Sequence, residues 1–313
     1  MAKEILRMED VTKIYDNGFV ANKNVTFWLH ESEILALVGE NGAGKTTLMK
    51  VLFGLETPQT GKVYMDGKEV KILNTLDAIE KGIGMVHQHF MLIPSLTVAE
   101  NVVLGVEPMK NGLFDFKKAV EMTEEVAKKY NFNIDPMARV SDLSVGQMQK
   151  IEIMKVLIKG AKIIIMDEPT AVLTPQETEE LFEQLILLRN SGHSIIFISH
   201  KLEEVKRICT RVTVLRHGYC LGSYDLKDMS EADISRLMVG RDVVLKIEKE
   251  DPTVGKTVLK IRNLVKNSAS GKRVLDDVSF DIHGGEVIGI AGVEGNGQSA
   301  LSDVLAGMES FSS

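Results

Sequence analysis

The chain has 313 residues, of which 44% are hydrophobic and 26% charged, an ordinary globular composition long enough for two domains. Its net charge of −7 excludes a general electrostatic attraction to nucleic acid or anionic lipid. Two cysteines argue against a disulfide scaffold, and no apolar run approaches the ~18 residues that span a bilayer.

The chain opens with two predicted strands, over residues 4–11 and 25–30, in which apolar residues alternate with polar ones. Tyr15 lies between them, and an exposed ring there could stack on a purine base. The alternative is a ring half-packed against the protein with its hydroxyl in water. That is the commoner arrangement, and both stay open on the residues alone.

A phosphate-binding loop is the clearest motif, since Gly39, Gly44, Lys45 and Thr46 fit the pattern G-x-x-x-x-G-K-[ST]. The apolar run over residues 34–38 predicts a buried strand before it, and helical spacing follows it. Glycines let backbone N–H groups face a phosphate, and the helix N-terminus adds its positive dipole end. We therefore expect Lys45 to reach the β- and γ-phosphates and the Thr46 hydroxyl to bind Mg²⁺.

An inserted helical subdomain is predicted farther along the chain. Residues 66–67 (Asp-Gly) predict a hairpin turn before it. Gln88 then follows a short strand, where its amide oxygen could face a metal or a water, although a surface-loop glutamine is the alternative. A capping box over residues 97–100 starts a helical region that runs, with a loop around residues 109–115, to about Tyr130 and interrupts the α/β pattern.

Ser144 and Gln147 also have capping-box spacing, at the start of a helix that Gly160 ends. One interpretation is an ordinary capped helix. The other is a second anion site, formed by a helix N-terminus with a small, glycine-flanked approach. Thr174 and Glu177 have the same capping-box spacing, at the start of the next predicted helix.

Two further strand ends carry candidate chemical groups. A strand over residues 163–166 is predicted to be buried on both faces and to end at Asp167 and Glu168, where α/β proteins place ligand sites. Asp167 can hold Mg²⁺, and Glu168 can orient and polarise an attacking water. His200 ends the predicted strand over residues 194–199 and could hydrogen-bond a γ-phosphate oxygen, with a surface histidine as the alternative.

The sequence repeats itself without a gap at a shift of 253 positions, the difference between Leu6 and Leu259. The repeat predicts that a second phosphate-loop domain begins at residue 257, after a charged linker over residues 244–256. Gln298 stands where Lys45 stands, so this second loop lacks its main charged contact to a phosphate. The match ends after Gly307, which we interpret as a truncated copy that leaves strands uncovered.

These motifs together resemble the ATP-binding cassette (ABC) ATPases, over residues 4 to about 241 and again from 257. GENGAGKT is similar to the Walker A loop, LSVGQ to the signature and IIIMDE to the Walker B strand. The resemblance implies an α/β P-loop fold with an antiparallel β subdomain. It implies one domain over 1–243, with a helical subdomain at about 88–158, and an incomplete second domain over 257–313 with a degenerate Walker A loop.

The resemblance also implies roles for individual residues. Glu168 and His200 match catalytic positions, and Thr46, Gln88 and Asp167 match positions around Mg²⁺. The positions that match ATP contacts are Tyr15, Gly39, Glu40, Asn41, Gly42, Ala43, Gly44, Lys45, Thr46 and Thr47, together with Ser144, Gly146 and Gln147, which would reach a nucleotide held by a different domain.

Val145, in place of the first signature glycine, and TAVLTPQE are similar to the tandem ATPases of simple-sugar and nucleoside importers, with the nucleoside branch favoured. This implies membrane permease subunits, an extracytoplasmic solute-binding protein, a peripheral location on the cytoplasmic face of the membrane, and no nucleic acid partner. Two alternatives stay open. One is a soluble tandem ABC protein acting on ribosomes or nucleic acid, and the other is an inactive truncated remnant.

Overall fold

The computed structural model describes residues 3–240, 254–268, 271–292 and 295–312. The chain divides into two compact units, Met1–Leu245 and Lys246–Ser313, each with a hydrophobic core of its own. The predicted linker over 244–256 lies mostly outside the described residues.

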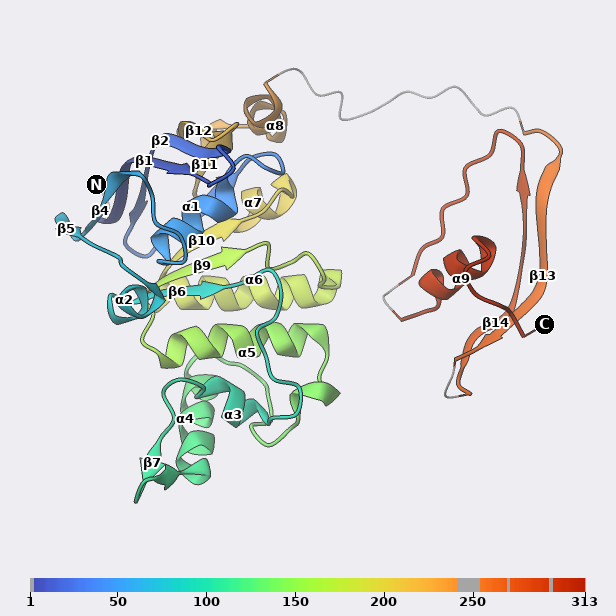
Figure 1. Ribbon diagram of the computed structural model, residues 1–313, viewed down its shortest axis with the longest axis horizontal. Helices are drawn as coiled ribbons and strands as arrows, with labels where there is room; N and C mark the ends of the chain where they lie inside the picture. The colour runs from blue at the N-terminus through green and yellow to red at the C-terminus, as the bar shows by residue number, and fades with distance from the viewer. Residues whose placement is uncertain (1–2, 241–253, 269–270, 293–294, 313) are drawn as a thin grey trace. The chain divides into compact units, whose positions relative to one another are not determined.

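Two sheets form the framework of the first unit (Figure 1). The antiparallel sheet has the order β2-β1-β4-β5, with β1 (Glu4–Ile14), β2 (Val20–His30), β4 (Thr60–Met65) and β5 (Lys68–Val70). The six-stranded sheet has the order β12-β11-β3-β10-β9-β6, with β3 (Ile34–Val38), β6 (Ile83–Val86), β9 (Ile163–Asp167), β10 (Ser194–Ile198), β11 (Arg211–Arg216) and β12 (Tyr219–Asp225). Its β12 is antiparallel to β11, and the other neighbours are parallel.

The predicted central strands are confirmed. Every residue of β3, β9 and β10 is buried, as expected for parallel strands covered on both faces. Successive side chains point to opposite faces. Ile34 and Ala36 therefore join the cluster that contains residues of α6 (Pro175–Asn190), while Leu35 and Leu37 join the one that contains residues of α1 (Lys45–Leu52). A continuous apolar run is therefore required here, and it is why the sequence reads as strand without alternation.

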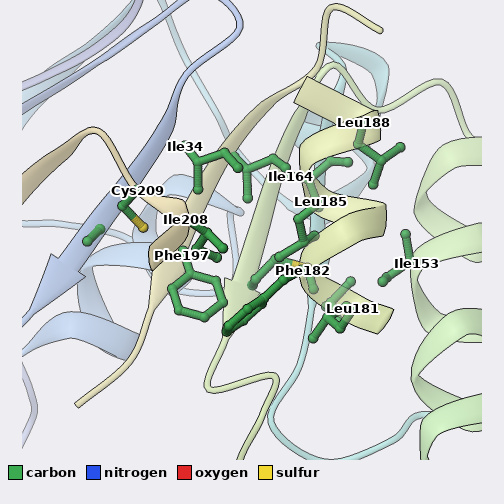
Figure 2. Packing of buried hydrophobic residues seen from close by; sticks show 14 of the residues in the cluster. Ile34, Ile153, Ile164, Leu181, Phe182, Leu185, Leu188, Phe197, Ile208 and Cys209 are labelled. Carbon is green, nitrogen blue, oxygen red and sulfur yellow. The ribbon is translucent and has the colours of Figure 1, made fainter. Parts of the chain in front are cut away.

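Helices cover both faces of the six-stranded sheet. Figure 1 shows α1 between the two sheets, with α6 and α5 (Val145–Ile158) on the other face of the six-stranded sheet. On α6, Leu181, Leu185 and Leu188 pack with Ile164 and Phe197 of the sheet (Figure 2). The helices of this unit are α1 (Lys45–Leu52), α2 (Thr75–Glu80), α3 (Val98–Val102), α4 (Phe116–Lys129), α5 (Val145–Ile158), α6 (Pro175–Asn190), α7 (Leu202–Ile208) and α8 (Glu231–Val239).

The inserted helical region lies between β6 and β9 and contains α3, α4 and α5. Its predicted capping boxes are confirmed at Thr97 and Ser144, where each cap side chain accepts from the backbone three residues on. A short hairpin, β7 (Met109–Lys110) and β8 (Leu113–Phe114), occupies the stretch that we expected to be a loop. Asn111 and Gly112 form its turn, both with positive φ.

The second unit repeats the start of the first. Its strands β13 (Thr257–Asn267) and β14 (Arg273–His283) pair antiparallel as β1 and β2 do, and α9 (Gln298–Leu305) corresponds to α1. The unusual backbone repeats too, since φ is 50° at Asp10 and 49° at the equivalent Asn263. This agreement extends the sequence repeat to backbone conformation.

The two units differ at the segment that corresponds to β3. In the second unit, Val287 is 94% exposed and Ile290 is 54% exposed, and this stretch is not a strand. In the first unit, β3 hydrogen-bonds to β10 and β11 on its two sides. A parallel strand depends on such neighbours, which come from distant parts of the sequence.

Candidate nucleotide site

The phosphate loop leaves the carboxyl end of β3 and enters α1 directly. Gly42 and Gly44 have φ values of 82° and 98°, in the left-handed region that favours glycine. A Cβ on Gly44 would lie 2.3 Å from the Ala21 carbonyl oxygen, so the close approach of β2 also requires glycine. Gly44 provides no side-chain cap for α1, so the N–H groups of the first turn of α1 are not capped in this way and can bind a ligand.

Lys45 extends back across the loop. Its Nζ donates to the carbonyl oxygens of Gly39, at 2.8 Å, and Glu40, at 3.1 Å. Burial lowers the pKa of Lys45, and the nearby carboxylates of Glu168 and Asp167 oppose that shift. An ammonium held by two neutral carbonyls in a partly desolvated loop keeps its charge available to an anion.

Thr46 and Asp167 bring oxygen ligands together. Thr46 Oγ1 donates to Asp167 Oδ1 at 3.3 Å, and Asp167 is only 3% exposed at the end of β9. Burial raises the pKa of Asp167, while the Thr46 hydrogen bond lowers it. A hydroxyl and a carboxylate are donors that suit Mg²⁺. Among the described residues there is no cluster of three or more His, Cys, Asp or Glu that could hold a metal.

Glu168 and His200 meet at neighbouring strand ends. His200 Nδ1 lies 3.3 Å from Glu168 Oε1, and the His200 side chain is 52% exposed. Glu168 has a φ of 49°, uncommon for a residue with a Cβ, and its N–H donates to the Ile198 carbonyl of β10. This backbone bond fixes the carboxylate between β9 and β10, within reach of the loop.

A cavity of about 370 Å³ is lined by Lys45, Thr46 and Glu168, while Asp167 and His200 are not among its lining residues. Its walls combine the phosphate loop with Gln88 after β6 and Glu168 after β9. Phe19, just before β2, and Ala21, within β2, complete it and were not predicted. The lining residues are Phe19, Ala21, Asn41, Gly42, Ala43, Gly44, Lys45, Thr46, Thr47, Gln88 and Glu168.

Tyr15 lies beside this cavity and is partly buried. Its hydroxyl is 3.3 Å from Thr47 Oγ1, and Lys13 Nζ sits 5.1 Å from the ring centroid. Phe19 is 55% exposed, so two aromatic rings flank this end of the loop. The sequence offers one indication of Phe19, which is its place directly after the turn residues Asp-Asn-Gly in DNGF.

The signature residues lie apart from that cavity and line another one, of about 140 Å³, between α5 and α6. Ser144 caps α5, and its Oγ accepts from the Gln147 N–H at 3.3 Å. The Gly146 N–H is bound by Glu177 Oε1, at 3.1 Å, from the first turn of α6. Within this chain, therefore, a side chain of α6 occupies the N-terminus of α5.

Glu177 is held as a carboxylate by several donors. Burial raises its pKa, but hydrogen bonds from the backbone and hydroxyl of Thr174, the Gly146 N–H and the Ser144 hydroxyl outweigh burial. The pKa of Glu177 consequently lies below its ordinary value of 4.5. The sequence predicted its role in the α6 capping box, and the bond to α5 was missed.

Comparison with known proteins gives consistent matches. A family model described as ABC transporter matches residues 22–171. A glucose import ATP-binding protein of Haloferax volcanii is 44% identical, over 98% of this chain and 61% of that protein. A guanosine import ATP-binding protein of Bacillus subtilis is also 44% identical, over 97% and 59%. A nucleoside import ATP-binding protein of Lactococcus lactis is 43% identical, over 98% and 61%. The chain thus spans about three-fifths of the length of these curated relatives.

Solved structures give the same fold. A dimeric bacterial ABC transporter cassette is similar with a TM-score of 0.62 and 27% identity, over 72% of this chain and all of that one. A post-hydrolysis cassette bound to ADP and Pi has the same TM-score and identity. In the ranges that the structure covers, no helix combines the length and apolar character needed to cross a membrane.

Proposed function

The first unit of this chain is an ABC transporter ATP-binding domain, and from this premise we propose that it binds and hydrolyses ATP to energise an importer of nucleosides or simple sugars. The observation that carries the proposal is one cavity in which the phosphate loop faces Glu168 and Gln88. Most of the loop lines it, and Lys45 and Thr46 are among the lining residues. Charge and hydrogen-bond donors there complement a triphosphate.

In this proposal the phosphates of ATP lie along residues 39–47. The loop amides and the Lys45 ammonium contact the β- and γ-phosphates. Tyr15 stacks on the adenine, and its position beside Thr47 supports that role. Thr46 and Asp167 would hold Mg²⁺ with Gln88 nearby, and the bound ion would neutralise charge on the phosphates.

Glu168 and His200 are proposed to act in hydrolysis. The Glu168 carboxylate lines the cavity, so it can accept a hydrogen bond from a water aimed at the γ-phosphate. His200 lies 3.3 Å from that carboxylate and can orient it while its other ring nitrogen contacts a phosphate oxygen. Its exposed side chain leaves that nitrogen accessible.

We further propose that Ser144, Gly146 and Gln147 contact a nucleotide held by another cassette. Their distance from the phosphate-loop cavity supports a contact in trans, because the two cavities share no lining residue. The partner cassette is a second copy of this domain or a second domain of the same assembly. The second unit, which repeats β1, β2 and α1, is proposed as the start of such a domain, with Gln298 in place of the loop lysine.

The relatives' names, which describe import ATP-binding proteins, support a proposal for the remaining partners. We propose membrane permease subunits and a solute-binding protein, with this chain peripheral on the cytoplasmic face. The relatives are import ATP-binding proteins, so a soluble protein acting on ribosomes or nucleic acid is not favoured. The net charge of −7 agrees with a chain that does not depend on nucleic acid.

The test is Mg²⁺-ATP binding and turnover by the purified full chain, with Lys45→Ala as the variant. Loss of a charged hydrogen bond of ~1.5–3 kcal/mol predicts binding weaker by about 10- to 100-fold. Lys50→Ala, in the last turn of the same helix and outside the cavity, is the matched control. ATP affinity that is the same for Lys45→Ala and the parent chain would refute the proposal.

A further inference from the structure

Glu177 caps two helices at once. Its Oε2 accepts from the backbone N–H and the hydroxyl of Thr174, each at 3.0 Å, which is the capping box of its own helix α6. Its Oε1 accepts from the Gly146 N–H at 3.1 Å and from the Ser144 hydroxyl at 3.4 Å, at the start of α5. One carboxylate oxygen is therefore placed on the proposed anion-binding end of the signature helix.

A phosphate and this carboxylate oxygen cannot use the same donors together. The Gly146 N–H carries a single hydrogen, and Glu177 Oε1 lies so close that a Cβ on Gly146 would be 2.6 Å from it. Two anions at this distance also repel each other strongly in a partly desolvated site. A nucleotide from another cassette must therefore displace Oε1 before it reaches Ser144 and Gly146.

The cavity beside Glu177 offers unused hydrogen-bonding groups. Gln149 and Gln184 line it and are 3% and 8% exposed. Gln149 Nε2 and Gln184 Oε1 are buried without a hydrogen-bond partner among the described residues. A buried amide donor left unpaired is costly, so Gln149 gives a displaced carboxylate oxygen an alternative partner.

We propose that Glu177 occupies the signature anion site in the free chain and must withdraw from it before the nucleotide of another cassette binds. Glu177 thereby sets how tightly two cassettes pair around ATP. This inference rests on the proposed contact of Ser144 and Gly146 with a nucleotide in trans. The α6 cap is able to persist during the exchange because it uses the other oxygen, Oε2.

The test measures ATP-dependent self-association of the full chain by sedimentation velocity, in a Glu168→Gln background that is expected to retain ATP. Glu177→Gln keeps a residue able to complete the capping box and removes the charge. We expect Glu177→Gln to pair at a chain concentration about five- to tenfold lower than the Glu168→Gln background does. The neutral amide oxygen is held less strongly than a carboxylate by the donors at the start of α5, so a nucleotide displaces it more easily. Glu100→Gln is the matched control, since Glu100 forms the same capping box on α3.

Thermal unfolding of each variant identifies effects on the fold. Glu177→Asp retains the charge and caps α6 as Asp233 caps α8, but its reach toward Gly146 is shorter, so an intermediate gain in pairing is expected. If Glu177→Gln pairs no more tightly than the Glu168→Gln background, while Glu100→Gln pairs as the background does, this inference is wrong. The proposed contact of Ser144 and Gly146 with a nucleotide is not affected by that result. A background chain that never pairs with ATP, at any concentration, overturns the proposed role of Ser144 and Gly146 and this inference with it.

Discussion

The Thr46 hydroxyl oxygen lies 3.3 Å from Asp167 Oδ1, although 121 positions of sequence separate the two residues. The contact exists because β3 and β9 both lie beside β10 and run parallel, so their carboxyl ends meet at one edge of the sheet. One strand delivers the phosphate loop and the other delivers the acidic pair. Chemistry at this edge therefore depends on strand order as much as on either motif.

Asp167→Asn is predicted to weaken the dependence of ATP binding on Mg²⁺. The substitution replaces a charged oxygen ligand with a neutral one while keeping its size, so the ion loses its strongest protein contact. ATP titrations with Mg²⁺ and with EDTA should differ clearly for the parent chain and little for the variant. If Mg²⁺ raises the ATP affinity of Asp167→Asn as much as that of the parent chain, Asp167 is not a ligand of the ion.

Glu168→Gln is predicted to retain ATP binding and to lose turnover by about 10²- to 10⁴-fold, the usual contribution of a positioned acid–base group. The amide is nearly isosteric with the carboxylate but accepts a proton poorly. Equilibrium ATP binding and steady-state phosphate release, measured on the same preparation, separate the two effects. Binding that falls in step with turnover would assign Glu168 to nucleotide binding and deny it a role in the chemical step.

Gln298→Ala is predicted to leave ATP binding by the first unit unchanged, because Gln298 starts α9 in the second unit, where the amide replaces the phosphate-loop lysine. The measurement is the ATP affinity of the full chain beside the Lys45→Ala variant. A large loss of affinity in Gln298→Ala would show that the second loop contributes a nucleotide contact despite its missing charge.

His193 is predicted to make stability depend on pH. Its Nδ1–H donates to the Ala161 carbonyl at 2.9 Å, so its Nε2 accepts from the Tyr130 hydroxyl at 2.8 Å, which links α4 to the strand layer. Burial lowers the pKa of His193 below its ordinary value of 6.5, and burial lowers that of His87 too. The unfolded chain therefore binds more protons than the folded chain just below pH 6.5.

It follows that the free energy of unfolding falls as pH decreases through that range and is highest above it. Urea unfolding at pH 7.5 and pH 5.5 measures the difference. His193→Gln can donate and accept but does not titrate, so its loss of stability should be smaller, with the remainder due in part to His87. An equal loss in the variant would mean that His193 does not contribute to this dependence.

Most of the fold, and the places of the candidate site residues in it, could be predicted because their signals are local. Continuous apolar runs at β3, β9 and β10 reflect burial on both faces, and Thr97 and Ser144 cap helices through residues three positions away. Asp167, Glu168 and His200 could be placed near one another because each follows a predicted parallel strand, and parallel strands have their carboxyl ends at one edge of the sheet.

What could not be predicted depends on contacts between distant or very short segments. Glu177 reaches Gly146 across 31 positions, and its capping role explained the residue without that bond. Phe19 lines the cavity only because β2 passes beside Gly44. The β7–β8 hairpin has too few residues to show a period. The segment that matches β3 in the second unit has the sequence of a strand, but in the described part of that unit it pairs with no neighbouring strand.

We propose that this chain hydrolyses ATP at the Glu168 cavity when two cassettes meet. The most direct test is ATP turnover per chain as a function of chain concentration, measured for the parent chain and for Glu168→Gln. We expect the parent rate per chain to rise with concentration and the Glu168→Gln rate to stay about 10²- to 10⁴-fold lower throughout. A rate independent of Glu168, or ATP binding with no turnover at any concentration, would refute the proposal.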